Sequence, residues 1–340
     1  MATVVTFGEL MLRLKTPGFL RLPQTTALEA SFGGGEANVA VSLALFGHES
    51  RYVSAIPADP IGDWAIGELR RHGVETSRVL RQGDRLGIYF LEAGASQRGS
   101  NVVYDRAGSA MAAINPGEVD WQGAFAGARW FHVTGITPAL SDSAAAASVE
   151  ALKAAKAGGL TTSLDLNYRQ KLWTTAKAGE VMATLMPFVD VAIANEEDCE
   201  KVFGIEAGRT VASGELQSQQ YLDVAAQMTA RFPNLKHVAV TLRESHNASH
   251  NGWSGLLVDR VGHSFSRRYD LVMVDRVGGG DSFAAGLIHA LIGGMNRQMA
   301  IEYAVAASAL KHSVSGDFNL VSLAEVEALV AGDGRGRVKR

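Results

Sequence analysis

Runs of consecutive apolar residues constrain the fold of this chain more than any other feature. Residues 189–194 read Val-Asp-Val-Ala-Ile-Ala, nearly continuous rather than alternating, as in a parallel strand covered on both faces. Similar β-rich runs alternate with helical patterns along most of the sequence. This order predicts an α/β fold with a doubly wound, mostly parallel sheet and helices on both of its faces. The strand candidates are 3–7, 51–56, 129–134, 160–166, 190–194 and 236–242, and the helix candidates are 35–46, 61–72, 141–157, 174–186 and 220–231.

Two stretches interrupt this alternation, residues 10–32 and 86–106, or 86–108 with the flanking turn. Both read as short strands with turn residues and no helix between them. They predict a small antiparallel sheet beside the main domain, whose natural use is a lid. The alternative is that they extend the central sheet at its edge. Polar stretches at 206–219 and 244–253 read as surface insertions, and the basic tail at 334–340 reads as a frayed, disordered terminus.

Length and composition limit the class of protein. The 340 residues, 47% of them hydrophobic, suit one large α/β domain with embellishments, and two smaller domains are the alternative. A net charge of −3 gives no indication of a nucleic-acid partner. The single cysteine, Cys199, excludes an internal disulfide framework and fits a reducing compartment. Without a signal pattern or a long apolar run, we expect a cytoplasmic protein with no membrane segment.

The clearest chemical signal is a glycine turn at residues 275–286, Asp-Arg-Val-Gly-Gly-Gly-Asp-Ser-Phe-Ala-Ala-Gly. The turn over 278–280 lets backbone N–H groups surround an anion, and the helix that follows adds a partial positive charge. Asp281 then stands at the mouth of an anion pocket, where a carboxylate has a purpose if it handles a proton. The pattern favours phosphoryl transfer to a hydroxyl. The alternative is an ordinary helix-capping aspartate.

Two further clusters of glycine and polar residues lie next to the predicted ends of strands and helices, where a ligand could bind. Residues 33–38, Gly-Gly-Gly-Glu-Ala-Asn, open the helix at 35–46, so Gly34 and Asn38 are candidates for contact with a polar ligand. The alternative there is close packing of strand and helix. Asn195 and Asp198 follow an apolar strand and could hold Mg²⁺ through water, although a helix dipole alone also favours acidic residues at this place.

Other familiar patterns are missing. No Gly-Lys dipeptide occurs, which excludes a Walker A loop, and no Gly-x-Gly-x-x-Gly follows a strand, which weakens a dehydrogenase interpretation. His246 and His250 have a metal-ligand spacing but lie in a polar stretch without a nearby acidic ligand. We interpret them as part of a surface loop.

Together the three clusters resemble the signatures of the ribokinase-like carbohydrate kinases, the PfkB family, over nearly the whole chain. Residues 33–38 are similar to the amino-terminal signature and 59–62 to its Asp-x-x-Gly element. Residues 195–198 are similar to the Asn-x-x-Glu motif, and 275–281 to Asp-Thr-x-Gly-Ala-Gly-Asp. The chain departs from these patterns at three positions, with Arg276 in place of Thr, Gly279 in place of Ala and Asp198 in place of Glu.

Within that family the segments 104–110, 165–173 and 311–319 look most like 2-keto-3-deoxygluconate kinases. A sugar acid needs a cation, and the planar fork of arginine suits a carboxylate, so Arg106 and Arg169 are the candidates. For either arginine the alternative is a surface salt bridge, and Arg169 has a third possibility, a contact to ATP phosphate. The resemblance implies ATP and Mg²⁺ as cofactors. The implied sugar-acid contacts are Gly34, Asn38, Tyr89, Tyr104, Arg106, Arg169, Asp281 and Asp317, and the implied ATP contacts are Asn167, Arg169, Thr241, Arg243, Glu244, Gly278, Gly280 and Ser313.

In the mechanism that follows, Asp281 is the general base for a primary hydroxyl, and Gly278, Gly279 and Gly280 form the anion hole. We expect the helix start to depress the pKa of Asp281. The alternatives are a kinase for a neutral ketose or pentose, such as fructose or ribose, or a catalytically silent regulator that binds a sugar acid or nucleotide. A nucleoside kinase is disfavoured because only 7% of residues are aromatic. The sequence leaves the gluconate or galactonate epimer open, and an exposed lid sheet predicts a homo-oligomer.

Overall fold

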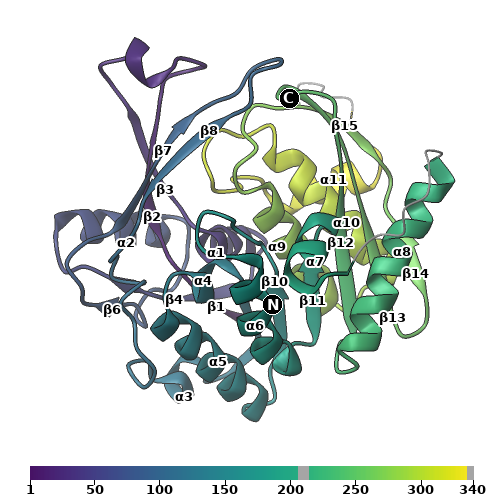
Figure 1. Ribbon diagram of the computed structural model, residues 1–340, viewed down its shortest axis with the longest axis horizontal. Helices are drawn as coiled ribbons and strands as arrows, with labels where there is room; N and C mark the ends of the chain where they lie inside the picture. The colour runs from purple at the N-terminus through teal and green to yellow at the C-terminus, as the bar shows by residue number, and fades with distance from the viewer. Residues whose placement is uncertain (206–213, 335–340) are drawn as a thin grey trace.

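The structure is a computed structural model that describes residues 1–205 and 214–334. A large twisted sheet forms the centre of the molecule (Figure 1). Within these residues the strand order is β14-β13-β12-β11-β10-β9-β1-β4, and β15 also pairs with β13. The strands from β12 along this order to β4 are parallel, whereas β13 is antiparallel to β12, β14 and β15. The bounds are β1 (Thr3–Phe7), β4 (Glu49–Val53), β9 (Ala128–Thr134), β10 (Thr161–Asp165), β11 (Val191–Ala194), β12 (His237–Ser245), β13 (His250–Asp259), β14 (His263–Phe265) and β15 (Tyr269–Val272).

Helices cover both faces of this sheet, as the apolar strands predict. The neighbouring residues Val4 and Val5 of β1 belong to two separate apolar clusters, one on each face. The cluster around Val5 includes residues of α5, α6, α7 and α8, and the cluster around Val4 includes residues of α1, α9, α10 and α11. The helices are α1 (Gly35–Leu45), α2 (Pro60–Arg71), α3 (Trp121–Ala124), α4 (Ile136–Ala139), α5 (Asp142–Ala157), α6 (Thr175–Leu185), α7 (Glu196–Phe203), α8 (Gly214–Arg231), α9 (Gly279–Ile292), α10 (Arg297–Lys311) and α11 (Leu323–Val330).

A separate small sheet contains the two stretches that interrupt the alternation. Its order is β3-β2-β7-β8, and Figure 1 shows it rising beside the main sheet. The expectation of a purely antiparallel sheet is wrong at its centre, where β2 and β7 are parallel. These strands lie far apart in sequence and are joined by a long crossover rather than by a hairpin, which permits parallel pairing. Their bounds are β2 (Met11–Lys15), β3 (Glu29–Gly33), β7 (Gly87–Glu92) and β8 (Asn101–Asp105).

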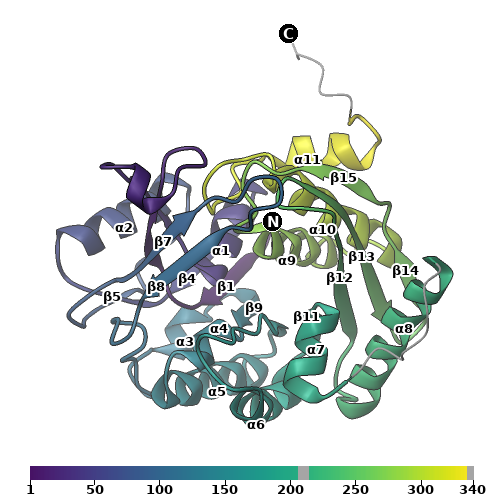
Figure 2. The ribbon, with the colours of Figure 1, turned by 45° about the horizontal axis from the view of Figure 1, so that its top comes forward.

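The tip of the β7–β8 hairpin reaches across to the main sheet (Figure 2). The backbone N–H of Ser96 donates to Oγ of Ser249 at 3.0 Å, and the N–H of Ala248 donates to the carbonyl of Ser96 at 2.8 Å. Ser96 adopts a positive φ of 52°, uncommon for a residue with a side chain. The small sheet is therefore tied at its tip to the turn between β12 and β13.

Several predicted boundaries change in the structure. The strand expected over 51–56 divides, because β5 (Ala55–Ile56) leaves the main sheet and pairs with β6 (Leu80–Arg81). The stretch 244–253 is not a surface insertion, because β12 and β13 form a long antiparallel hairpin through it. Its polar residues lie at the closed end of that hairpin. Residues 206–213 and 335–340 lie outside the described residues, and with them most of the first predicted insertion and nearly all of the basic tail.

The last helix, α11, begins with the capping box formed by Ser322 and Glu325. No helix in the described ranges is both long and apolar enough to cross a membrane.

Candidate active site

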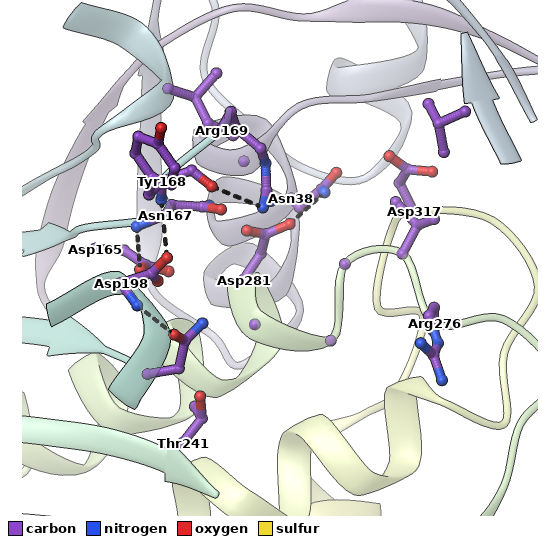
Figure 3. A pocket seen from close by; sticks show the side chains of 18 of the residues that line it. Asn38, Asp165, Asn167, Tyr168, Arg169, Asp198, Thr241, Arg276, Asp281 and Asp317 are labelled. Carbon is purple, nitrogen blue, oxygen red and sulfur yellow. Dashed lines mark hydrogen bonds between the residues drawn. The ribbon is translucent and has the colours of Figure 1, made fainter. Parts of the chain in front are cut away.

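A cavity of about 650 Å³ opens beyond the carboxyl ends of the parallel strands β10 and β11, the usual ligand position in such a sheet. The small sheet borders it on one side and the start of α9 on another (Figure 3). Most of the predicted site residues line it: Gly34, Asn38, Tyr89, Tyr104, Arg106, Asn167, Arg169, Asn195, Asp198, Thr241, Arg243, Gly278, Gly279, Gly280, Asp281 and Asp317. Two predicted ATP contacts do not line it. Glu244 pairs with Arg268, and Oγ of Ser313 donates to the carbonyl of Leu310.

The glycine turn is shaped by close contacts of its backbone. Gly278 has a φ of 84°, in the left-handed region, and a Cβ there would lie 2.1 Å from the carbonyl oxygen of Asp317. A Cβ at Gly279 would lie 2.6 Å from Cε1 of His312. Helix α9 begins directly after the turn, so the N–H groups of its first turn have no partner within the helix and face an incoming anion.

Asp281 lies in the first turn of α9 and is almost fully buried at the cavity wall. Nδ2 of Asn38, on α1, donates to Oδ2 of Asp281 at 2.6 Å, and Oδ1 of Asn38 accepts the N–H of Gly34 at 3.3 Å. The expectation of a depressed pKa for Asp281 is wrong. Burial raises the pKa to about 6 and outweighs the hydrogen bond from Asn38, which acts in the opposite direction. Asp281 is therefore still mostly a carboxylate at pH 7.

Behind the cavity wall at Asp317 lies a buried ionic cluster whose arginine the sequence analysis did not identify. The guanidinium of Arg13, on β2, pairs with both Asp275 and Asp317, and all three side chains are nearly inaccessible. The hydroxyl of Tyr89 donates to Oδ1 of Asp317 at 2.6 Å. Burial raises the pKa of Tyr89 well above its usual range, so it remains a hydrogen-bond donor. Arg13 escaped notice because a single arginine in a short strand carries no distinctive pattern.

The two predicted arginine contacts differ in their surroundings. Arg106 donates from Nε to Oε2 of Glu9 at 2.8 Å and also from Nη2, so its charge is balanced by a carboxylate buried beside it. Arg169 forms no ion pair within the residues that the structure describes, and its positive charge lowers the pKa of Asp281 against the effect of burial. Both arginines line the cavity, and Arg169 acts there on the pKa values of Asp165, Asp198 and Asp281 without an ion-pair contact to any of them.

Two buried acidic side chains lie close to each other, Asp165 at the end of β10 and Asp198 in the first turn of α7. Burial raises the pKa of Asp198 to about 6 and that of Asp165 well above its usual range, and the charge of Asp198 adds to the shift of Asp165. Oδ1 of Asn195 caps α7 by accepting the N–H of Asp198 at 2.7 Å. Asp165 was missed by the sequence analysis, although its place at the end of a strand was a usable signal. Among the described residues, no group of three or more His, Cys, Asp or Glu side chains is arranged to hold a metal ion directly.

The sequence of this chain matches a known protein family. The profile of the pfkB family carbohydrate kinases matches residues 1–322. The chain belongs to the pfkB family of carbohydrate kinases. As predicted, the ribokinase-like α/β fold and the separate small sheet are those of this family, and the protein is a carbohydrate kinase.

Relatives of the pfkB family with similar sequences and structures include kinases of 2-keto-3-deoxy sugar acids. A 2-dehydro-3-deoxygluconokinase from Thermotoga maritima has a crystal structure with a TM-score of 0.93 and 46% identity, covering 98% of this chain and 100% of that one. The 2-dehydro-3-deoxygalactonokinase of Haloferax volcanii is 33% identical over 98% of each chain. The 2-dehydro-3-deoxygluconokinase of Bacillus subtilis is 28% identical over 93% of this chain and 91% of its own.

The Asp-x-x-Gly element of the pfkB family, residues 59–62, has a structural role in this chain. Oδ1 of Asp59 accepts the N–H of Gly62 at 2.7 Å and so caps α2, and neither residue lines the cavity. A Cβ at Gly62 would lie 2.1 Å from the carbonyl oxygen of Pro57. The Asp-x-x-Gly element therefore sets the entry of the chain into α2.

Proposed function

We propose that the protein transfers the γ-phosphoryl group of ATP to the primary hydroxyl of a sugar acid, 2-keto-3-deoxygluconate, and forms its 6-phosphate. The observation that carries this proposal is the position of Asp281. Its carboxylate lies on the cavity wall directly after the glycine turn, where a hydroxyl and a phosphate could meet.

Asp281 is the general base in this proposal. A pKa of about 6 makes it a stronger base than an ordinary aspartate while leaving it mostly ionised at pH 7. The hydrogen bond from Asn38 fixes the position of one carboxylate oxygen. The N–H groups at Gly278, Gly279 and Gly280 would stabilise the negative charge of the transferred group, which supplies the larger share of the rate in a loose transition state.

The polar groups on the small-sheet side fit a sugar acid. Arg169 carries a charge that no ion pair in the described part of the chain balances, and Nη1 of Arg106 is not engaged by Glu9. Together they offer donors to a carboxylate. Tyr89, Tyr104 and Asp317, with the backbone at Gly34, line the same side and would bind the keto and hydroxyl groups.

The opposite side of the turn fits a nucleotide with Mg²⁺. Asn167, Thr241 and Arg243 line that part of the cavity and are the proposed ATP contacts. Asp198, with Asn195 beside it, offers the oxygen ligands that Mg²⁺ accepts through water, and burial raises the pKa of Asp198 although the charge of Arg169 lowers it. When bound, Mg²⁺ neutralises charge on the phosphate chain.

The small sheet serves as a lid in this proposal, because its hairpin already crosses to the turn at Ser249 and Tyr104 projects from β8 into the cavity. We propose that its outer surface also forms a homo-oligomer. The side chain of Val103 on β8, an edge strand of this sheet, points away from Tyr104 and is 47% exposed.

The test is a screen for ADP release with 2-keto-3-deoxygluconate, 2-keto-3-deoxygalactonate, gluconate, fructose and ribose. We expect turnover with the first substrate and much less with the neutral sugars. The galactonate epimer is included because the Haloferax volcanii relative bears its name. Preferred turnover of fructose or ribose would replace the proposal with a neutral-sugar kinase. No ADP release from any substrate would favour a silent regulator.

A further inference from the structure

Arg276 occupies an unusual position in the cavity wall. It lies two residues before Gly278, lines the cavity and is about half-buried. Its Nη2 donates to Oδ1 of Asn251 at 3.3 Å, a neutral partner. In the ranges that the structure describes, no carboxylate forms an ion pair with it. Burial alone lowers its pKa, and no neighbouring charge contributes to that shift.

Two other arginines in or near the cavity wall have buried carboxylate partners. Arg13 is held by Asp275 and Asp317, and Arg106 is held by Glu9. A partly buried guanidinium without a counter-ion is costly unless a ligand provides the negative charge. Arg276 therefore indicates an anionic group of a ligand.

Its neighbours show which part of the cavity this anion occupies. The ring of His312, which packs against Gly279, lies 5.2 Å from the ring of Trp253, and the guanidinium of Arg243 lies 5.1 Å from that same ring. The charge of Arg276 acts on the pKa of His312, so it belongs to the same group of residues. In Figure 3 the side chain of Arg276 points away from Asn38 and Asp317, which line the proposed sugar side.

We propose that Arg276 binds the β-phosphate of the nucleotide, the phosphate next to the one transferred. The proposal rests on the proposed function, because it takes the glycine turn as the site of the γ-phosphate. The planar fork of arginine suits two phosphate oxygens, which the threonine usual at this position of the family signature could not contact in the same way.

Asn251 positions this guanidinium. Asn251 is 1% exposed, its Oδ1 accepts a hydrogen bond from Oγ of Ser245 at 3.2 Å, and its Nδ2 donates to the carbonyl of Asn247 at 3.0 Å. An amide at this place orients the arginine without neutralising it, and the charge remains available to phosphate. A purely structural contact would be equally well served by a carboxylate.

The first experiment measures the binding of ADP and AMP by calorimetry without any sugar. For Arg276→Met we expect ADP to bind about 10- to 100-fold more weakly, as for the loss of a charged hydrogen bond, and AMP to bind almost as before. Arg78→Met is the matched control, because it removes a surface arginine paired with Asp120 away from the cavity. Unchanged ADP affinity, or equal losses for ADP and AMP, would overturn the proposal.

The second experiment separates binding from structure. Asn251→Asp puts a carboxylate beside the guanidinium while Arg276 itself remains. We expect ADP affinity to fall toward that of Arg276→Met in a variant whose thermal unfolding shows that it is folded. If Arg276 only supports the structure, ADP affinity stays at the original value. Because these assays need neither sugar nor turnover, their outcome is independent of the substrate screen.

Discussion

The two sides of the glycine turn treat their charges in opposite ways. The acceptor side faces the small sheet and is the proposed site of the sugar acid, whereas the donor side is the proposed site of the nucleotide. On the acceptor side each charged group is paired with another group of the protein. The exception is Arg169, which lies between the two sides. On the donor side, the carboxylates accept hydrogen bonds from backbone N–H groups and Arg276 donates to a neutral amide, but no ion pair within the described residues balances their charges. The acceptor side comprises Arg13, Tyr89, Arg106 and Asp317, and the donor side comprises Asp165, Asp198 and Arg276.

This difference has a physical reason in the ligands that we propose. A sugar acid brings one charge and many hydroxyl groups, so it requires a fixed arrangement of donors and acceptors. A nucleotide with its metal brings several charges of both signs, and open charges of the protein can meet them. The acceptor side is therefore preorganised by its own ion pairs, whereas the donor side is completed by its ligand.

The largest effect is expected at Asp281, where the two sides meet. Asp281→Asn should lower kcat by about two to four orders of magnitude, with much smaller changes in KM for either substrate, because the base is lost and the shape is kept. Steady-state kinetics with both substrates varied measures this. Near-normal turnover by the variant would remove Asp281 from the role of base.

Arg13→Met tests the acceptor side for stability. It leaves Asp275 and Asp317 buried without their cation, and we expect a loss of about 3–5 kcal/mol in the free energy of unfolding, measured in urea. Arg276→Met is the comparison and should cost much less, since no carboxylate is left behind. Similar losses for the two variants would mean that the two sides do not differ as described.

Arg106→Ala tests the reading of the acid. The loss of a charged hydrogen bond should raise KM for the sugar acid about 10- to 100-fold, and far more than KM for a neutral ketose. Because Glu9 would lose its buried cation and keep only the hydroxyl of Ser109, Arg106→Ala with Glu9→Gln serves as a control that removes the carboxylate charge. If KM rises equally for the acid and the ketose, Arg106 does not read the carboxylate.

The pH dependence of kcat/KM is expected to show the smallest effect, and it tests a single contact. Burial raises the pKa of Asp281 to about 6, so the reactive carboxylate is lost as the pH falls through that value, and kcat/KM should fall with it. Asn38→Ala removes a hydrogen bond that favours the charged form, so this acidic limb should move to higher pH. A limb that stays in place or moves to lower pH would contradict the assigned contact.

Local patterns predicted those parts of the molecule that depend on a few adjacent residues. The helix predicted over 35–46 is α1 (Gly35–Leu45), and the strand predicted over 190–194 is β11 (Val191–Ala194). The antiparallel edge at β13 to β15 was not predicted, because its polar residues gave no clear period. Similarly, the turn 246–249 was read as part of an insertion when it closes a hairpin.

The sequence by itself determined the alternation of strands and helices as far as residue 242, the glycine turn and the presence of Asp281 after it, because each depends on neighbours in the chain. Only the tertiary structure decided the charge state of the site. Asn38 meets Asp281 across 243 residues and Arg13 meets Asp317 across 304, and burial reverses the effect expected from the helix start on the pKa of Asp281. Charge depends on distance and on access to water, and neither is encoded in the spacing of residues along a chain.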